Sequence, residues 1–133
     1  MLWVSLLLGL LLSSEVCARI SDRVPSRFEA VTLIAWYEAR GETVKVQNLV
    51  VDSAYNRAII SDKSLHQVLK EPRQYPWVAK LKTWRLTTEQ AEFGFKLLKH
   101  RSPIRSGYFY FNHVPHEFTK KNVRIGNLYF AVR

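Results

Sequence analysis

The stretch RFEAVTLIAWYEAR at residues 27–40 decides the fold, and Gly41 follows it directly. Its apolar residues recur mostly at three- and four-residue spacings, the period of one helix face. They include Phe28, Val31, Ile34 and Ala35. Gly41 suits the left-handed conformation that closes many helices. We therefore expect a helix over 27–40 that carries Glu38 near its end.

Similar patterns predict three more helices. Apolar residues recur at helical spacing over 44–60, which predicts a long second helix. Ser64 is a suitable N-cap for a short helix that runs to Lys70. Thr87 and Gln90 form a capping-box pattern, in which each side chain binds the other residue's backbone N–H. That pattern predicts a helix over 88–100.

The remaining segments have a different composition. EPRQYPWV at 71–78 contains two prolines and two aromatic residues, so we expect an irregular loop with exposed rings. Residues 107–112 and 123–132 are rich in aromatic and β-branched residues, which favours two strands joined by a polar loop. Helices come first and a β-hairpin last, so the predicted fold class is α+β.

The N-terminus has the pattern of an export signal. A leucine-rich run over 2–12 is too short to span a bilayer comfortably, and Val16-Cys17-Ala18 fits a signal-peptidase site. We expect residues 1–18 to be a signal peptide or a retained membrane anchor, and residues 19–133 to be one catalytic domain. The 133-residue length fits a single core. The predicted location is the periplasm or cell wall.

Charge and cysteine content narrow the function classes. A net charge of +9 favours polyanionic partners such as nucleic acid, an anionic membrane or a wall polymer. A single cysteine, Cys17, excludes an internal disulfide framework and paired-cysteine zinc sites. His113, His116 and Glu117 give only a weak metal signal. We expect no metal and no organic cofactor, and the export segment argues against nucleic acid.

Glu38 is the most informative carboxylate. Ile34, Ala35, Trp36 and Tyr37 precede it, and apolar surroundings raise a carboxyl pKa because they disfavour the ionised form. A raised pKa is what a general acid needs near neutrality. On periodicity alone, a salt bridge at the helix end is the alternative interpretation.

Five blocks of sequence support the interpretation of Glu38 as a general acid. Tyr37-Glu38-Ala39-Arg40-Gly41-Glu42 resembles the A-E-A-R-G-E signature of SleB-type cell-wall hydrolases. Four further blocks resemble that family's motifs in the same order over about residues 30–132. They are Gln47 with Asn56-Arg57, Gln74-Tyr75-Pro76-Trp77, Gly107-Tyr-Phe-Tyr-Phe-Asn112-His113, and Arg124-Ile125-Gly126-Asn127-Leu128-Tyr129-Phe130.

The resemblance implies a small lysozyme-like domain, related to goose-type lysozymes and lytic transglycosylases, with Glu38 as the principal catalytic residue and no cofactor. The implied reaction is cleavage of the β-1,4 bond between N-acetylmuramic acid and N-acetylglucosamine in peptidoglycan. A transglycosylase needs one acid, whereas a hydrolytic muramidase needs a second carboxylate or an activated water, for which Glu42 and Asp52 are the candidates. A non-catalytic wall-binding module is the remaining alternative.

Sugar binding requires flat rings and amide or hydroxyl groups. Strand alternation pairs Tyr108 with Tyr110 and Asn112 on one face, and leaves Phe109 and Phe111 for the core. We expect a monomer that binds glycan strands, with basic groups attracting the carboxylates of the peptide stems. The candidate substrate-binding residues are Asn56, Gln74, Tyr75, Tyr108, Tyr110, Asn112 and His113.

Overall fold

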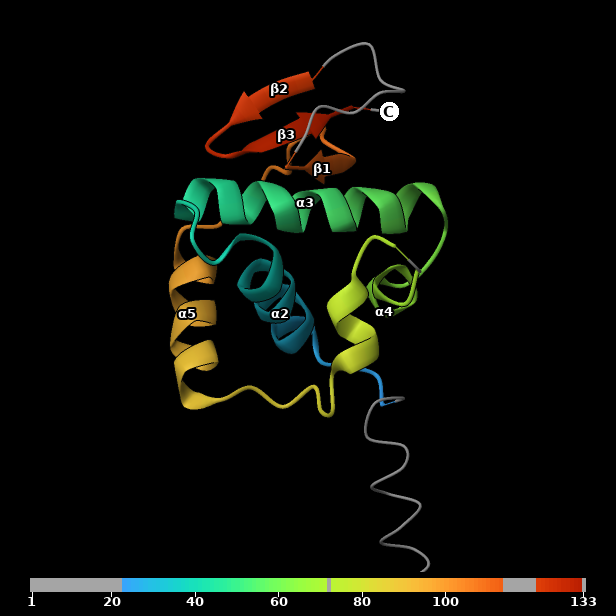
Figure 1. Cartoon of the computed structure of the whole chain (residues 1–133), viewed down its shortest axis with the longest axis vertical. Helices are drawn as coiled ribbons and strands as arrows, with labels where there is room; N and C mark the ends of the chain where they lie inside the picture. The colour runs from blue at the N-terminus through green and yellow to red at the C-terminus, as the bar shows by residue number, and fades with distance from the viewer. Residues whose placement is uncertain (1–22, 72, 114–121, 133) are drawn as a thin grey trace, which may run out of the picture.

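The computed structural model describes residues 23–71, 73–113 and 122–132 (Figure 1). The expected leader at 1–18, and His116 and Glu117, lie outside these residues. Within the described part of the chain, no helix has the length and apolar character required to cross a membrane. The described residues form four α-helices and a three-stranded antiparallel sheet, which confirms the α+β class.

The helices follow the predicted boundaries closely, but the expectation of a left-handed Gly41 is wrong: among the described glycines only Gly126 has a positive φ. The helices are α2 (Arg27–Ala39), α3 (Val44–Ile60), α4 (Leu65–Leu69) and α5 (Thr88–Lys99). Each begins at a serine or threonine whose hydroxyl accepts a backbone N–H: Ser26, Thr43, Ser64 and Thr87. These caps satisfy donors that a helix start otherwise leaves unpaired, and each is typically worth about 1 kcal/mol.

The proline-containing segment after α4 is more ordered than expected. It ends in a short 3-10 helix, η2 (Pro76–Lys80). The prediction of exposed rings is wrong for Tyr75, which is only 2% exposed. Its ring is packed edge-on against Trp77, and the Arg57 guanidinium lies 5.9 Å from its centre. Arg57 is distant in sequence and Trp77 lies beyond Pro76, so the local composition did not indicate that the Tyr75 ring would be covered.

The sheet has one more strand than the predicted hairpin. Its strands are β1 (Tyr110–Asn112), β2 (Asn122–Ile125) and β3 (Leu128–Ala131), in the spatial order β1-β3-β2. The expected single strand at 123–132 is instead two strands that turn at Gly126 and Asn127. Gly126 has a φ of 63°, which glycine adopts without the strain of a side chain. The expected pairing between the two aromatic segments is present as β1 with β3.

Helix α3 lies between the sheet and the other helices (Figure 1). It buries Val50, Val51 and Ala54 completely. Helix α5 packs closely on α2 because Gly94 has no side chain: a Cβ there would lie 2.2 Å from the Thr32 hydroxyl and 2.9 Å from the Phe28 ring. The end of α2, which carries Glu38, lies beside η2, to which a side-chain hydrogen bond joins it.

Candidate active site

Glu38 lies in the last turn of α2, partly buried beside η2. Its Oε1 accepts a hydrogen bond of 2.9 Å from the indole N–H of Trp77. Burial raises the pKa of Glu38, and this effect exceeds the lowering by the Trp77 hydrogen bond and by the nearby charge of His113. The raised pKa favours the protonated acid and makes Glu38 a candidate proton donor.

Aromatic rings surround this carboxyl group. Tyr37, which is 45% exposed, stacks on Trp77 with the ring centres 4.7 Å apart and the planes 15° from parallel. Tyr75 contacts the same indole edge-on at 6.3 Å. Stacked rings with an open face suit the apolar faces of sugars. Trp77 belongs to one of the family-like blocks of the sequence, but Tyr37 was not predicted as a binding ring, although it directly precedes the predicted acid.

Arg57 joins the rings beside Glu38 to the sheet. Its guanidinium lies 5.9 Å from the ring centre of Tyr75 and 5.7 Å from that of Tyr110, and it forms an ion pair with Glu71. Burial raises the pKa of Tyr75, although the adjacent Arg57 charge partly opposes this. The Tyr75 hydroxyl therefore remains a hydrogen-bond donor at neutral pH. The salt bridge of Glu38 to a helix-end cation, the alternative interpretation, is not formed within the described residues.

Some of the candidate binding residues are linked to Glu38, and others have different surroundings. Tyr75 and His113 both interact electrostatically with Glu38, and Tyr110 is linked to Tyr75 through Arg57. Asn112 is exposed at the end of β1, and its Oδ1 accepts the backbone N–H of His113 at 2.8 Å.

Three further candidates have other surroundings. Gln74 is partly buried just before η2. Tyr108 packs on Phe130, with the ring centres 5.3 Å apart. Asn56 faces the segment after α5, where its amide donates to the carbonyls of Ser106 and Tyr108 at 2.6 and 2.9 Å.

Gln47 positions the helix end that carries Glu38. Its amide nitrogen donates to the carbonyls of Ala39, Arg40 and Glu42 at 3.2, 3.3 and 3.0 Å. The Ala39 carbonyl also accepts the backbone N–H of Glu42 at 2.9 Å, and the Gln47 amide adds the donors that a helix end lacks because it has no next turn. The sequence contained Gln47 within a family-like block, but the block does not indicate this structural role.

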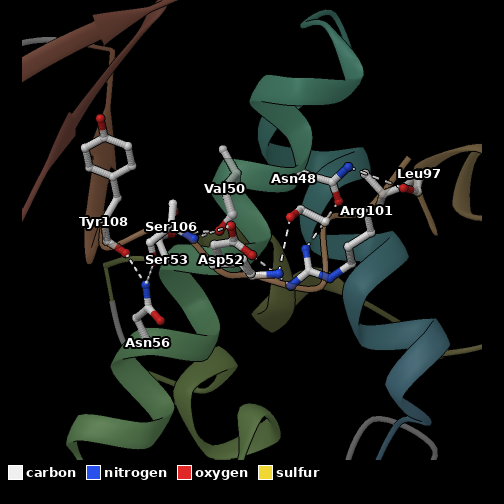
Figure 2. Close-up of polar contacts among 11 residues, drawn as sticks. Asn48, Val50, Asp52, Ser53, Asn56, Leu97, Arg101, Ser106 and Tyr108 are labelled. Atoms are coloured by element: carbon white, nitrogen blue, oxygen red, sulfur yellow. Dashed lines mark hydrogen bonds and ion pairs between the residues drawn. The ribbon is translucent and has the colours of Figure 1, made fainter. Parts of the chain in front are cut away.

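Three polar side chains on α3 hold the segment that leads to the sheet (Figure 2). Asn48, Asp52 and Asn56 are four residues apart, so they lie along one helix face. Asp52 accepts from the Arg101 guanidinium at 2.8 Å and from the Ser106 N–H at 3.0 Å. Asn48 donates to the Leu97 carbonyl, and its oxygen accepts from Arg101. In the sequence, this role was indicated by the four-residue spacing of polar residues within an otherwise apolar helix.

Glu42 has a comparable structural role. Its carboxylate accepts the backbone N–H of Asn127 at 3.4 Å, and so connects the turn after α2 to the turn between β2 and β3. A Cβ at Gly126 would lie 2.5 Å from the same carboxylate oxygen, so only glycine fits there unless Glu42 moves. Both carboxylates that were candidates for a hydrolytic role, Glu42 and Asp52, thus have partners away from Glu38.

Comparison with known proteins assigns neither a family nor a function to the chain. No protein-family model matches the chain, and neither the curated proteins nor the solved structures searched contain a match to it. Among the described residues, no three histidine, cysteine, aspartate or glutamate side chains are grouped in a way that would hold a metal ion.

Proposed function

We propose that this protein cleaves the β-1,4 bond between N-acetylmuramic acid and N-acetylglucosamine in peptidoglycan, as a lytic transglycosylase with Glu38 as its general acid and base. One observation carries the proposal: Glu38 is a partly buried carboxyl with a raised pKa, hydrogen-bonded by Trp77 and bordered by stacked rings. Catalytic acids are commonly tuned toward neutrality in this way.

The reaction requires one carboxyl group in two protonation states. Glu38 donates its proton to the glycosidic oxygen as the bond from that oxygen to the anomeric carbon of the muramic acid breaks. The resulting Glu38 carboxylate then accepts the proton of the same sugar's 6-hydroxyl while that oxygen bonds to the anomeric carbon. The products are a 1,6-anhydromuramic end and a free 4-hydroxyl on N-acetylglucosamine, and Glu38 is protonated again.

The surroundings of the other carboxylates favour this route over hydrolysis. A hydrolytic muramidase uses a second carboxylate as nucleophile or as the base for a water molecule. Asp52 is paired with Arg101, and Glu42 contacts the backbone of Asn127. Both carboxylates are already bound to other groups, whereas a hydrolytic role requires one that is free to meet the substrate or a water molecule.

The same proposal includes a lysozyme-like fold, membership of the SleB-type family and export to the cell wall. It is supported by the family-like motif around Glu38 and by the arrangement of an acid at a helix end beside a small antiparallel sheet. The rings of Tyr37 and Trp77 would contact sugar faces, and Tyr110, Asn112 and His113 would bind from the sheet side. The basic net charge suits an anionic wall polymer.

The test is mass spectrometry of the products released from purified sacculi by the full-length protein. We expect anhydromuramic ends, and a loss of rate of about a hundredfold or more in Glu38→Gln, the usual scale of general acid catalysis. Glu92→Gln is the matched control, because it removes an exposed carboxylate on α5 and should leave the rate unchanged.

Three outcomes would contradict the proposal in different ways. Reducing muramic ends would indicate a hydrolytic muramidase. Full activity in Glu38→Gln would remove Glu38 from the mechanism. Binding to sacculi without any released product from the unaltered protein would indicate a non-catalytic wall-binding module.

A further inference from the structure

Two hollows lie on either side of residues 101–106, the segment that leads from α5 toward β1. The first has a volume of about 860 Å³ and lies between the start of α2, the middle of α3 and the end of α5. The second, of about 700 Å³, lies beside the start of α3. Arg101, Ser102, Arg105 and Ser106 line both. Glu38 and Trp77 line neither hollow, and of the candidate substrate-binding residues only Asn56 lines the first.

The first hollow has an excess of positive charge. Arg27, Arg101 and Arg105 line it, and no carboxylate does so among the described residues. Asp52 neutralises Arg101 from the neighbouring hollow. Arg27 and Arg105 form no ion pair in the part of the chain that the structure describes. Two guanidinium groups are therefore available to an anionic ligand.

Several contacts hold Arg27, Arg101 and the backbone of Ser106 at this hollow before any ligand binds. The guanidinium groups of Arg27 and Arg101 lie 5.5 and 5.4 Å from the centre of the Tyr55 ring. Asp52 binds both Arg101 and the backbone of Ser106 (Figure 2). A binding site whose groups are already in place loses less conformational entropy when a ligand binds.

The shape and remaining lining indicate the kind of ligand. Phe28, Val31 and Leu98 supply apolar surface, and Ser102 supplies a hydroxyl group. A concave, partly apolar site with a few cationic groups suits an extended chain that carries carboxylates and small apolar side chains. A flat bilayer would instead require apolar and basic side chains that project outward. Arginine forks match carboxylates particularly well.

We propose that this hollow binds the peptide stems of peptidoglycan, with Arg27 and Arg105 contacting their free carboxylates. The inference rests on the proposed function, since it takes the same polymer as the ligand. It adds a second contact with that polymer, through its peptide part, away from the glycan bond beside Glu38.

The first test uses the full-length protein and a soluble stem peptide, with binding followed by NMR shifts of backbone amides. We expect shifts to be concentrated in residues 101–106 and at the start of α2. Amidation of the peptide's carboxylates should weaken binding about tenfold, the effect expected from losing two screened charge contacts. Equal binding of the amidated peptide, or shifts confined to the surroundings of Glu38, would overturn the proposal.

The second test compares variants. Arg27→Gln with Arg105→Gln should weaken sedimentation with sacculi about tenfold. Lys82→Gln with Arg85→Gln is the matched control, because it removes the same charge from exposed residues outside both hollows. All proteins carry Glu38→Gln, so that the sacculi stay intact. Equal losses in the two double variants would overturn the proposal, because only bulk charge would then matter.

Two further measurements separate this proposal from its alternatives. With Glu38 intact, the double variant at Arg27 and Arg105 should cleave stem-free glycan strands at the unaltered rate. Absence of cleavage by every protein would count against the proposed function, while the stem-binding result would stand by itself. Binding to phosphatidylglycerol vesicles that requires Arg27 and Arg105, without binding of the stem peptide, would identify a membrane site instead.

Discussion

Trp77 donates a hydrogen bond to Glu38 across 39 residues of sequence, and so opposes the effect of burial on the same carboxyl group. Burial favours the neutral acid, whereas the indole N–H favours the carboxylate. Burial has the larger effect, so the pKa remains raised. A group that first donates and then accepts a proton benefits from such opposing contributions, because neither protonation state is strongly excluded.

Replacement of Trp77 by phenylalanine should raise the pKa of Glu38 further. The variant keeps an aromatic ring but removes the N–H that stabilises the carboxylate. The protonated acid should then persist to higher pH, and the basic limb of the rate profile should move upward. A carbon-13 NMR titration of the Glu38 carboxyl measures the pKa directly. An unchanged or lowered value would contradict the assigned role of the indole.

Glu38→Gln should gain stability relative to the unaltered protein as pH rises. The pKa of Glu38 is raised above its usual 4.5, so ionisation costs the folded state more than the unfolded state. The unaltered protein therefore has this contribution in full below pH 4.5 and loses it as pH rises through the folded-state pKa. Urea unfolding at about pH 4 and about pH 8 measures the difference. A constant difference between the two proteins would refute the prediction.

Asp52→Asn should destabilise the fold without changing the type of product. Loss of the ion pair with Arg101, which is mostly buried, should lower the free energy of unfolding by about 2–3 kcal/mol. Asp62→Asn, at an exposed position, should change it by less than about 0.5 kcal/mol. Anhydromuramic products should persist in both variants. Complete loss of cleavage in a folded Asp52→Asn protein would instead indicate a catalytic carboxylate.

Gly94→Ala should be destabilising although it lies inside a helix. Alanine is favoured over glycine in a helix by about 1 kcal/mol. Here its Cβ would lie 2.2 Å from the Thr32 hydroxyl and 2.9 Å from the Phe28 ring, so these side chains or α5 itself must shift. We expect a net loss of about 1–3 kcal/mol by urea unfolding. Gly107→Ala is the control, since a Cβ there meets nothing within 4 Å. Equal stability of the two variants would contradict the close helix packing.

The features predicted correctly from sequence are those that depend on neighbouring residues. The N-cap at Ser64 and the capping box that begins at Thr87 act within four residues, and the starts of these two helices followed from them. The division of 123–132 into two strands was missed, although Gly126-Asn127 is a turn sequence. The apolar residues on both sides of it form an almost continuous run, which favoured a single strand.

Prediction of the candidate site from sequence was limited in the same way. The residues before Glu38 correctly indicated a shielded carboxyl with a raised pKa. Sequence spacing did not reveal that Trp77 would donate to it, or that Asn56 would bind the backbone of residues 106 and 108. Such contacts join segments 39 to 52 residues apart, and they depend on how the helices pack. Local periodicity contains little information about that packing.

The contact of Glu42 with Asn127 has a mechanical consequence. Glu42 follows Glu38 by four residues, and its carboxylate accepts the Asn127 N–H, so the helix end that carries Glu38 is tied to the outer turn of the sheet by a single side chain. A side chain at position 126 would meet that carboxylate and force Glu42 to move. A substitution in this distant turn should therefore disturb the loop that follows Glu38 before it disturbs the core.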